Sequence, residues 1–266
     1  MKQVKSKILT SICAVLVGVL VHQTANAQNF GVNFLGNTPS DPITGAAGVV
    51  SLTGWNNIAN QTYTSGTITA DNFSTANLTL SGSAANGWRS SGTGNGGNGS
   101  LMDGYMDITA GGTGTAVISG LVSGQLFDIY LYTFGDQVRP SNGGDKLPNY
   151  SVNGTTYYVP TLGVGTSTFN ATAATVGGSF SGFIRATTYN ANFNTATANA
   201  SDFGNYIKIQ NVAATGGILT IAAGSDTTTW RSPLNGIELV AVPEPTTLAL
   251  SAVGLTMLGL IRRRNK

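Results

Sequence analysis

Short runs of β-branched and aromatic residues recur between residues 28 and 241, and clusters of Gly, Asn, Ser and Asp separate them. Such runs are typical of strands, and such clusters are typical of turns. No helical pattern of about ten residues lies among them. The sequence therefore predicts an all-β domain, a β-sandwich of jelly-roll type. The runs are FGVNFL, ANLTLSG, TAVISGL, LFDIYLYTF, TTYYVP, GFIRAT, NYIKIQNV, GILTIAAG and NGIELVA.

Alternation within these runs indicates which strands have a buried face. Ile207 and Ile209 alternate with polar residues, and Ile237 and Leu239 flank Glu238 in the same way, so each run predicts a strand with one buried face. Residues 127–132 instead carry apolar or aromatic side chains on both faces apart from one Asp, which predicts a central strand that is covered on both sides.

Two glycine-containing stretches predict turns and loops. Asn153-Gly154 separates two short strand-like runs, which is the strongest local signal for a β-hairpin. Residues 90–100 contain only Ser, Gly, Thr and Asn and no apolar side chain, so we expect a mobile surface loop there.

The N-terminal segment has the pattern of an export signal. Three lysines precede an apolar stretch at residues 8–21, and Ala25-Asn26-Ala27 follows it. This order predicts a secretory signal peptide at residues 1–27, with Ala25 and Ala27 as the small residues of the cleavage site and cleavage after Ala27. The secretion translocon is then an expected partner.

The C-terminal segment has the pattern of a membrane anchor. Residues 246–261 carry only small or aliphatic side chains with Thr, Ser and Met, and three arginines follow. As a helix at ~1.5 Å per residue the run reaches roughly 24 Å, somewhat short of a ~30 Å hydrocarbon layer, which the arginine stems can extend. The sequence predicts a single transmembrane helix at residues 246–261, with the arginines inside the cell.

The order of Pro243-Glu244-Pro245, apolar run and basic cluster resembles the PEP-CTERM sorting signal of bacterial surface proteins, which would span residues 242–266. The resemblance implies that exosortase, a membrane-embedded transpeptidase, recognises Pro243, Glu244 and Pro245. It also implies that Arg262, Arg263 and Arg264 are the stop-transfer charges. A Gram-negative host that makes exopolysaccharide, and a destination at the cell surface or in the extracellular matrix, follow from it. The alternative is a plain membrane anchor that no enzyme processes.

Residue content excludes several kinds of chemistry from residues 28–241. The only Cys and the only His of the chain, Cys13 and His22, lie in the signal peptide. This excludes catalytic dyads or triads built on His or Cys, zinc sites built on these residues, and disulfides. We expect neither a cofactor nor a metal. Six basic and ten acidic residues give 6 − 10 = −4 up to Ala241, which does not suit nucleic acid.

Aromatic and acidic residues supply the candidate binding sites. Aromatic faces stack on sugar rings, so Trp55, Trp88 and Trp230 are candidate glycan-binding residues; burial in the sandwich is the alternative for each. The tyrosines that could join them are Tyr105, Tyr157 and Tyr158. Four aspartates near predicted strand ends could bind calcium, and solvated turn carboxylates are the alternative: Asp103, Asp107, Asp136 and Asp145.

The residues point to an exported, non-catalytic surface or matrix protein that associates with exopolysaccharide through its β-sandwich. Residues 231–239, RSPLNGIEL, resemble the closing Asn-Gly-Ile strand of malectin-like and galactose-binding-like domains, which favours glycan binding. A purely structural or adhesive protein is one alternative. A polysaccharide-cleaving enzyme that uses Asp or Glu carboxylates is another, although Glu238 is the one glutamate outside the sorting tripeptide.

Overall fold

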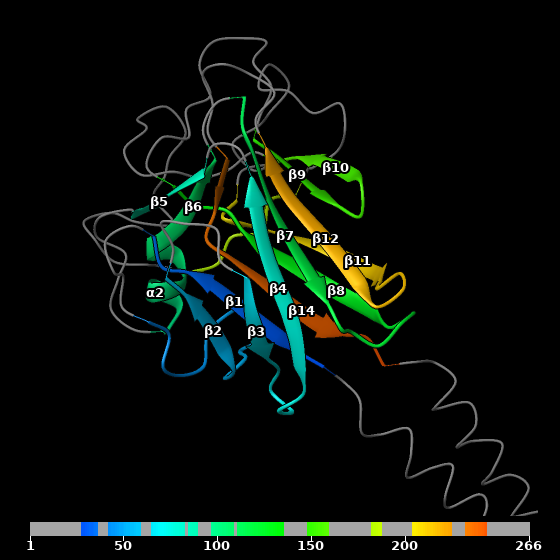
Figure 1. Ribbon diagram of the computed structural model, residues 1–266. Helices are drawn as coiled ribbons and strands as arrows, with labels where there is room; N and C mark the ends of the chain where they lie inside the picture. Colours follow the sequence, from blue (N-terminus) through cyan, green and yellow to red (C-terminus); the bar gives the residue numbers. More distant parts are fainter. Residues whose placement is uncertain are drawn as a thin grey trace, which may run out of the picture. The chain divides into compact units, whose positions relative to one another are not determined.

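The computed structural model describes residues 28–36, 42–59, 65–82, 85–89, 97–108, 111–135, 148–159, 182–187, 204–224 and 232–243. Most of them lie in strands, and Gln28–Val240 forms one compact unit (Figure 1). The predicted all-β class is therefore confirmed. The predicted signal peptide and the predicted transmembrane helix at residues 246–261 lie outside the described residues. Within the described ranges, no helix is long and apolar enough to cross a membrane.

A five-stranded sheet has the order β11-β8-β14-β1-β2. Its central strand β14 pairs antiparallel with β1, whereas β1 pairs parallel with β2. The first and last strands of the described unit are therefore neighbours. The bounds are β1 Phe30–Phe34, β2 Trp55–Ile58, β8 Leu126–Tyr132, β11 Tyr206–Ala213 and β14 Gly236–Ala241.

A six-stranded sheet has the order β10-β9-β12-β7-β4-β3, and its neighbouring strands are all antiparallel. Buried and exposed residues alternate along β4, so one face of this sheet packs inward and the other faces solvent. The bounds are β3 Ser65–Thr69, β4 Thr75–Gly82, β7 Thr113–Ser119, β9 Asn149–Val152, β10 Thr155–Tyr158 and β12 Ile218–Gly224.

A small three-stranded sheet, β13-β6-β5, and the short helix α2 complete the unit. Helix α2 spans Gly97–Asp103 and leads directly into β6. The strand bounds are β5 Ala85–Arg89, β6 Gly104–Ile108 and β13 Ser232–Leu234.

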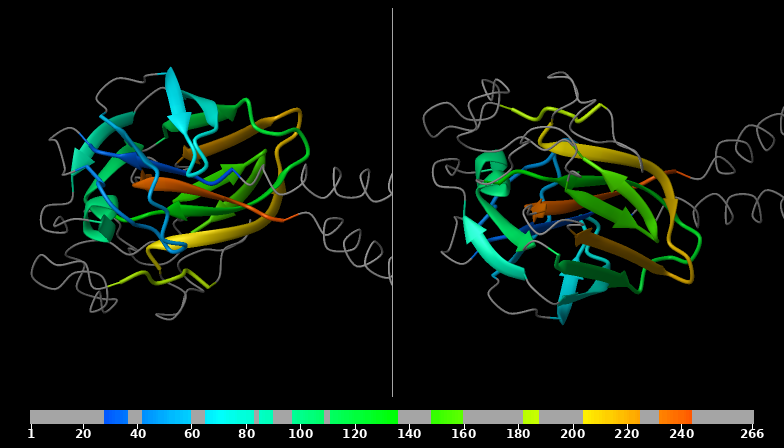
Figure 2. Two further views of the ribbon diagram at one scale, coloured as in Figure 1. Left: turned by 90° about the horizontal axis from the view of Figure 1, so that it is seen from below. Right: turned by 90° about the horizontal axis from the view of Figure 1, so that it is seen from above.

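The two larger sheets form two layers (Figures 1 and 2), and buried apolar side chains from both contribute to the core. On the six-stranded sheet the core residues include Leu78, Ile118 and Ile221, and on the five-stranded sheet they include Val32 and Ile129, all of which are buried. The outer face of the five-stranded sheet is covered as well, because β14 and most of β8 are buried on both faces. The layered all-β architecture agrees with the predicted sandwich, and the jelly-roll type stays a prediction.

Most of the predicted strands are present. Eight of the nine runs contain a strand, and residues 127–132 lie in β8, an inner strand of the five-stranded sheet that is covered on both sides over most of its length. The hairpin at Asn153-Gly154 is confirmed: β9 and β10 pair across it, and both turn residues have positive φ, 47° and 85°. The alternation around Ile207 and Ile209 also holds, since Lys208 is only half-buried between them.

Three expectations are wrong. The run GFIRAT at residues 182–187 forms no strand and makes only an isolated bridge from Arg185 to Tyr206. The predicted mobile surface loop at residues 90–100 is wrong for its described part: residues 97–100 begin helix α2, and Gly99 and Ser100 are buried, with Leu101 and Met102 in the core. Residues 90–96 lie outside the described residues. Glu238 is not on an open face of its strand: it is fully buried.

Candidate functional site

The outer face of the five-stranded sheet is covered by the connection between its two parallel strands. Parallel neighbours cannot be joined by a tight hairpin, so the chain from β1 to β2 has to return across the sheet. Its described part, residues 42–54, contains a small hairpin closed by the bridge between Ala47 and Leu52. We call residues 47–52 the cover turn. Ser51 in this turn has a positive φ of 61°.

Strand register places a row of residues beneath the cover turn. Gly31 on β1 pairs with Trp55 on β2 and with Glu238 on β14, so these three residues share one face of the sheet. Tyr132 on β8 continues the row, because its hydroxyl donates a very short hydrogen bond to Glu238 Oε2. The row therefore crosses the four strands β2, β1, β14 and β8.

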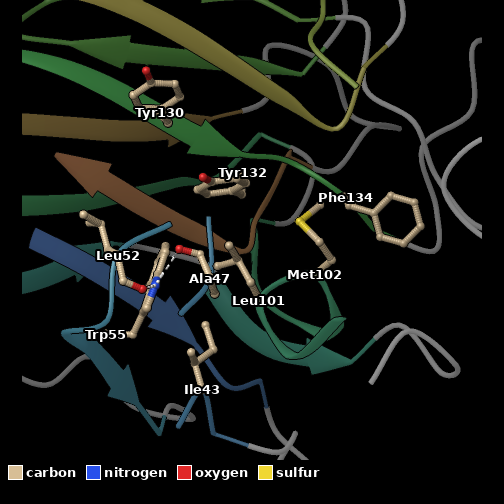
Figure 3. Close-up of a cluster of buried hydrophobic side chains, with 9 residues drawn as sticks. All are labelled: Ile43, Ala47, Leu52, Trp55, Leu101, Met102, Tyr130, Tyr132 and Phe134. Carbon is tan, nitrogen blue, oxygen red and sulfur yellow. Dashed lines mark hydrogen bonds between the residues drawn. The ribbon is translucent and has the colours of Figure 1, made fainter. Parts of the chain in front are cut away.

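Trp55 holds the cover turn in place. Its indole Nε1 donates to the carbonyl oxygens of Ala47 at 3.1 Å and Leu52 at 3.0 Å, the two residues that close the hairpin (Figure 3). The indole lies against Gly31, where a Cβ atom would come within 2.6 Å of ring atom Cδ2. It also packs edge-on against Tyr132, with ring centroids 6.1 Å apart. Only glycine at position 31 leaves room for this arrangement.

Backbone N–H groups of the cover turn point at Tyr132 and Glu238. Val49 N donates to the Tyr132 hydroxyl at 2.7 Å, and Val50 N lies 3.3 Å from Glu238 Oε1. Gly48 N donates to Asn98 Oδ1 of helix α2 at 2.9 Å. At Gly48, whose φ is +93°, a Cβ would lie 2.9 Å from Glu238 Oε2, so the turn rests directly on the carboxyl group. The buried acid is thus hydrogen-bonded on both of its oxygens.

Burial raises the pKa values of the Glu238 carboxyl group and the Tyr132 hydroxyl group. Loss of solvent raises the pKa of Glu238 from 4.5 to about 7, although the hydrogen bonds from Tyr132 and from the turn N–H groups partly oppose this. Burial also raises the pKa of Tyr132 well above 10.0, and the nearby Glu238 charge adds to that increase. The carboxyl group can therefore gain or lose a proton near neutral pH, while the turn keeps it away from a bulky ligand.

An aromatic edge adjoins the covered row. Tyr206 on β11 and Phe183 are half-buried and pack at right angles with ring centroids 6.1 Å apart, and Phe183 also lies 5.2 Å from Tyr132. On the same strand Lys208 forms an ion pair with Asp128 at 2.6 Å, which raises the pKa of the lysine. We call Tyr206, Phe183 and Lys208 the aromatic edge. The sequence did not predict this edge, because the run GFIRAT, which contains Phe183, was expected to form a strand.

The predicted aromatic site residues are not brought together as an open platform by the described chain. Trp55 is 8% exposed and belongs to the core cluster in Figure 3, which matches burial, the alternative given for each tryptophan. Trp88 lies in β5, paired with Tyr105 of β6, and Tyr105 is buried. Trp230 lies outside the described residues.

The predicted sorting residues are described only at their start. Pro243 is exposed, two residues after the end of β14. The remaining predicted signal and sorting residues lie outside the described ranges: Ala25, Ala27, Glu244, Pro245, Arg262, Arg263 and Arg264.

Two of the four aspartates considered for calcium are described, and neither is the solvated turn carboxylate expected as the alternative. Asp103 ends helix α2 and Asp107 lies in β6, and both are buried. Asp136 and Asp145 lie outside the described residues. Across the described ranges, no group of three or more His, Cys, Asp or Glu residues could hold a metal ion.

The Asn-Gly-Ile segment has a structural role. The buried Asn235 side chain accepts from Phe134 N at 2.5 Å and donates to the carbonyl oxygens of Met102 at 3.2 Å and Gly104 at 3.0 Å. It thereby joins the end of β8 to helix α2 and β6. At Gly236 a Cβ would lie 2.7 Å from both Leu101 Cδ1 and the Val32 carbonyl oxygen. These contacts account for the Asn-Gly pair without a ligand.

Comparison with known proteins identifies the tail of the chain. No curated protein matches the chain. Among solved structures, an exo-beta-1,3-galactanase from Phanerochaete chrysosporium with beta-1,3-galactotriose aligns at 14% identity and a TM-score of 0.28. The alignment covers 59% of this chain and 26% of that one, so this chain spans about a quarter of the galactanase, and the low TM-score does not show a shared fold. Residues 241–265 match the model of the PEP-CTERM protein-sorting motif, so this chain is a protein with the C-terminal sorting signal of exosortase substrates.

Proposed function

We propose that the protein is an exported, non-catalytic component of the cell surface or extracellular matrix, sorted by exosortase and associated with exopolysaccharide through its β-sandwich. The observation that carries the proposal is the sorting motif at residues 241–265, which begins where strand β14 ends. Exposure of Pro243 supports access of the processing enzyme to the first residue of the tripeptide.

The aromatic edge supports contact with a glycan. Tyr206 and Phe183 are half-buried, and Lys208 lies on the same strand as Tyr206. Apolar faces of sugar rings stack on such aromatic side chains, and a cation beside them suits an acidic or hydroxyl-rich polymer. We therefore assign glycan contact to this edge in preference to the buried Trp55.

Closure of the Glu238 site supports a non-catalytic role. Glycosidases place two carboxyl groups on either side of the scissile bond, typically ~5–9.5 Å apart, and both have to reach the sugar. Glu238 lies beneath the cover turn, and both of its oxygens accept hydrogen bonds from the protein. A polymer could reach this carboxyl group only after the turn had moved.

Sorting is tested first by intact mass spectrometry of the protein from the native cell surface. We expect a C-terminus near Pro243 to Pro245, because the tripeptide is the recognition element of the motif. Glu244→Ala should be exported and remain unprocessed, whereas the matched change Thr247→Ala, which keeps the tripeptide, should be processed normally. A chain of Glu244→Ala that is trimmed like the wild type would instead support a plain anchor cut elsewhere.

Glycan association is tested by co-sedimentation with exopolysaccharide purified from the same cells. Tyr206→Leu should lose most of the binding, while Tyr157→Leu, a half-buried tyrosine on β10 of the other sheet, should retain it. Absence of binding by the wild type would favour the structural or adhesive alternative. Release of shorter sugar chains by the wild type, lost in Glu238→Gln, would favour the polysaccharide-cleaving alternative.

A further inference from the structure

Exposed apolar side chains gather at the end of the sandwich from which the chain continues toward the sorting motif. Phe73 is 88% exposed, Ile218 is 43% exposed and Val122 is 40% exposed. They lie in three separate connections: Phe73 between β3 and β4, Val122 between β7 and β8, and Ile218 at the start of β12. Three connections thus present large apolar side chains to solvent, which folded domains ordinarily minimise.

Strand register shows that these connections are neighbours. Ser119 at the end of β7 pairs with Asn77 near the start of β4 on one side and with Ile218 on the other. In the loop after β7, Leu121 N donates to the carbonyl oxygen of Gly217 at 3.1 Å. The turns that hold Phe73, Val122 and Ile218 therefore lie along one end of the six-stranded sheet (Figure 1).

The chain leaves the sandwich at the same end. Asp71 N, two residues before Phe73, donates to the carbonyl oxygen of Asn29 at 3.0 Å. Asn29 immediately precedes β1, whose Phe30 pairs with Leu239 near the end of β14. The last strand before the sorting motif thus ends beside the turn that carries Phe73, and Pro243 is exposed just beyond it.

The backbone holds Phe73 outward in a conformation that a bulky residue rarely adopts. Its φ is 62°, and its N–H donates to the Ala70 carbonyl oxygen at 2.9 Å. Ser74 N bonds Asn72 Oδ1 at 3.0 Å, and Asp71 Oδ1 accepts from Gly54 N at 2.8 Å, so the turn is tied to its own polar side chains and to the residue before β2. Residues that are held in uncommon backbone conformations are often functional, so the exposed ring of Phe73 is a candidate contact residue.

We propose that Phe73, Val122 and Ile218 form a membrane-contact surface that rests in the lipid headgroup region while the sorting tail is still anchored. The inference depends on the proposed function, because it requires residues 246–261 to span the bilayer. Only residues 242–245 separate β14 from that apolar run, and four extended residues reach at most ~14 Å. This end of the sandwich is therefore held at the headgroup layer, where aromatic side chains are favoured.

The contact would orient the domain for processing. A single aromatic ring and two aliphatic side chains bind lipid weakly on their own, but a tethered domain meets the bilayer at high effective concentration. Once the tail is cut, that advantage is lost and the surface releases. The predicted contact thus belongs to the anchored precursor and not to the released domain.

The test uses a fluorescent depth probe on the full chain in phospholipid vesicles. Cysteine is introduced at position 73 in a Cys13→Ser background, which makes it the only thiol, and is labelled with NBD. Thr113→Cys, exposed at the opposite end of β7, is the matched control. Flotation with the vesicles, compared with a chain that lacks residues 242–266, first reports the anchor itself. We expect brominated lipids to quench the label at Phe73→Cys at least twofold more than the label at Thr113→Cys.

Each result has a defined meaning. Equal quenching at the two positions, in protein that floats with the vesicles, overturns the membrane-contact surface and leaves the anchor intact. Protein that does not float contradicts the anchor in the proposed function. If the label at position 73 is shielded from aqueous quenchers but is not quenched by bromine, the contact is with a second copy of the chain. If shielding appears only on addition of exopolysaccharide, the contact is with a glycan. Both results overturn the lipid assignment.

Discussion

The buried carboxyl group of Glu238 should make the stability of the domain fall as pH rises through neutrality. The pKa of this group is about 7 in the folded protein and 4.5 ordinarily, so the folded state holds its proton more tightly than the unfolded chain does. Stability is then highest below pH 4.5 for this group and decreases as pH rises through the folded pKa. The difference of about 2.5 pH units between the two pKa values corresponds to roughly 3 kcal/mol, most of which is lost between pH 5 and pH 8.

The change to examine is Glu238→Gln, which keeps the shape of the side chain and removes its titration. The amide oxygen can still accept from Tyr132, and only the long 3.3 Å contact with Val50 N is lost. Urea denaturation followed at pH 5, 6, 7 and 8 measures the free energy of unfolding of both proteins. Relative to the wild type, Glu238→Gln should gain roughly 2–3 kcal/mol across this range, a midpoint shift on the order of 1 M urea.

A matched control separates this effect from general loss of negative charge. Asp128→Asn removes a carboxylate from the same sheet, where it pairs with the partly exposed Lys208, and should leave the fall in stability with pH in place. If the wild type and Glu238→Gln change in parallel from pH 5 to pH 8, solvent reaches Glu238 in the folded state. The cover turn would then not be closed over the carboxyl group.

Three further changes test other contacts. Gly31→Ala should cost ~1–3 kcal/mol and shift tryptophan fluorescence, because the new methyl group displaces the Trp55 indole, whereas Gly45→Ala, which meets no atom within 4 Å, should leave both unchanged. Asn235→Ala should destabilise by roughly 3 kcal/mol or more in urea denaturation, because three buried backbone groups lose their partner; a loss below ~1 kcal/mol would show that water replaces the amide. Phe73→Asn should raise the free energy of unfolding by up to ~1 kcal/mol, since Asn tolerates a φ of 62°, and a lower stability would mean that the ring packs on the fold.

The strands were predictable from sequence where burial follows local alternation. The runs that became β4, β7, β8 and β12 place apolar residues at every second position, and the Asn153-Gly154 turn has the φ angles that this pair prefers. Short strands without such runs were missed. WNNI in β2 is an example, because it has no apolar alternation and Asn57 finds its side-chain partner in Asn33 of β1, 24 residues away.

The candidate site was less predictable because its cover comes from far along the chain. Glu238 meets Val50, 188 residues away, and Tyr132, 106 residues away. The residues around Glu238 do not indicate either contact, because the flanking Ile237 and Leu239 predict a strand with one open face. Phe73 is a similar case, since a positive φ at a phenylalanine has no signature in sequence. The sorting tail was the opposite case, since its order of residues is itself the signal.

The central place of β14 in its sheet sets an order of events during export. A chain that is delivered from its N-terminus supplies β1 first and Gly236–Ala241 last, yet these two strands are hydrogen-bonded neighbours. Until the last strand arrives, β1 and β8 present unpaired edges and the sheet cannot close. The fold therefore cannot be complete until the segment directly before the sorting motif has been delivered, so cleavage at that motif would act on a chain that already holds every strand of the sheet.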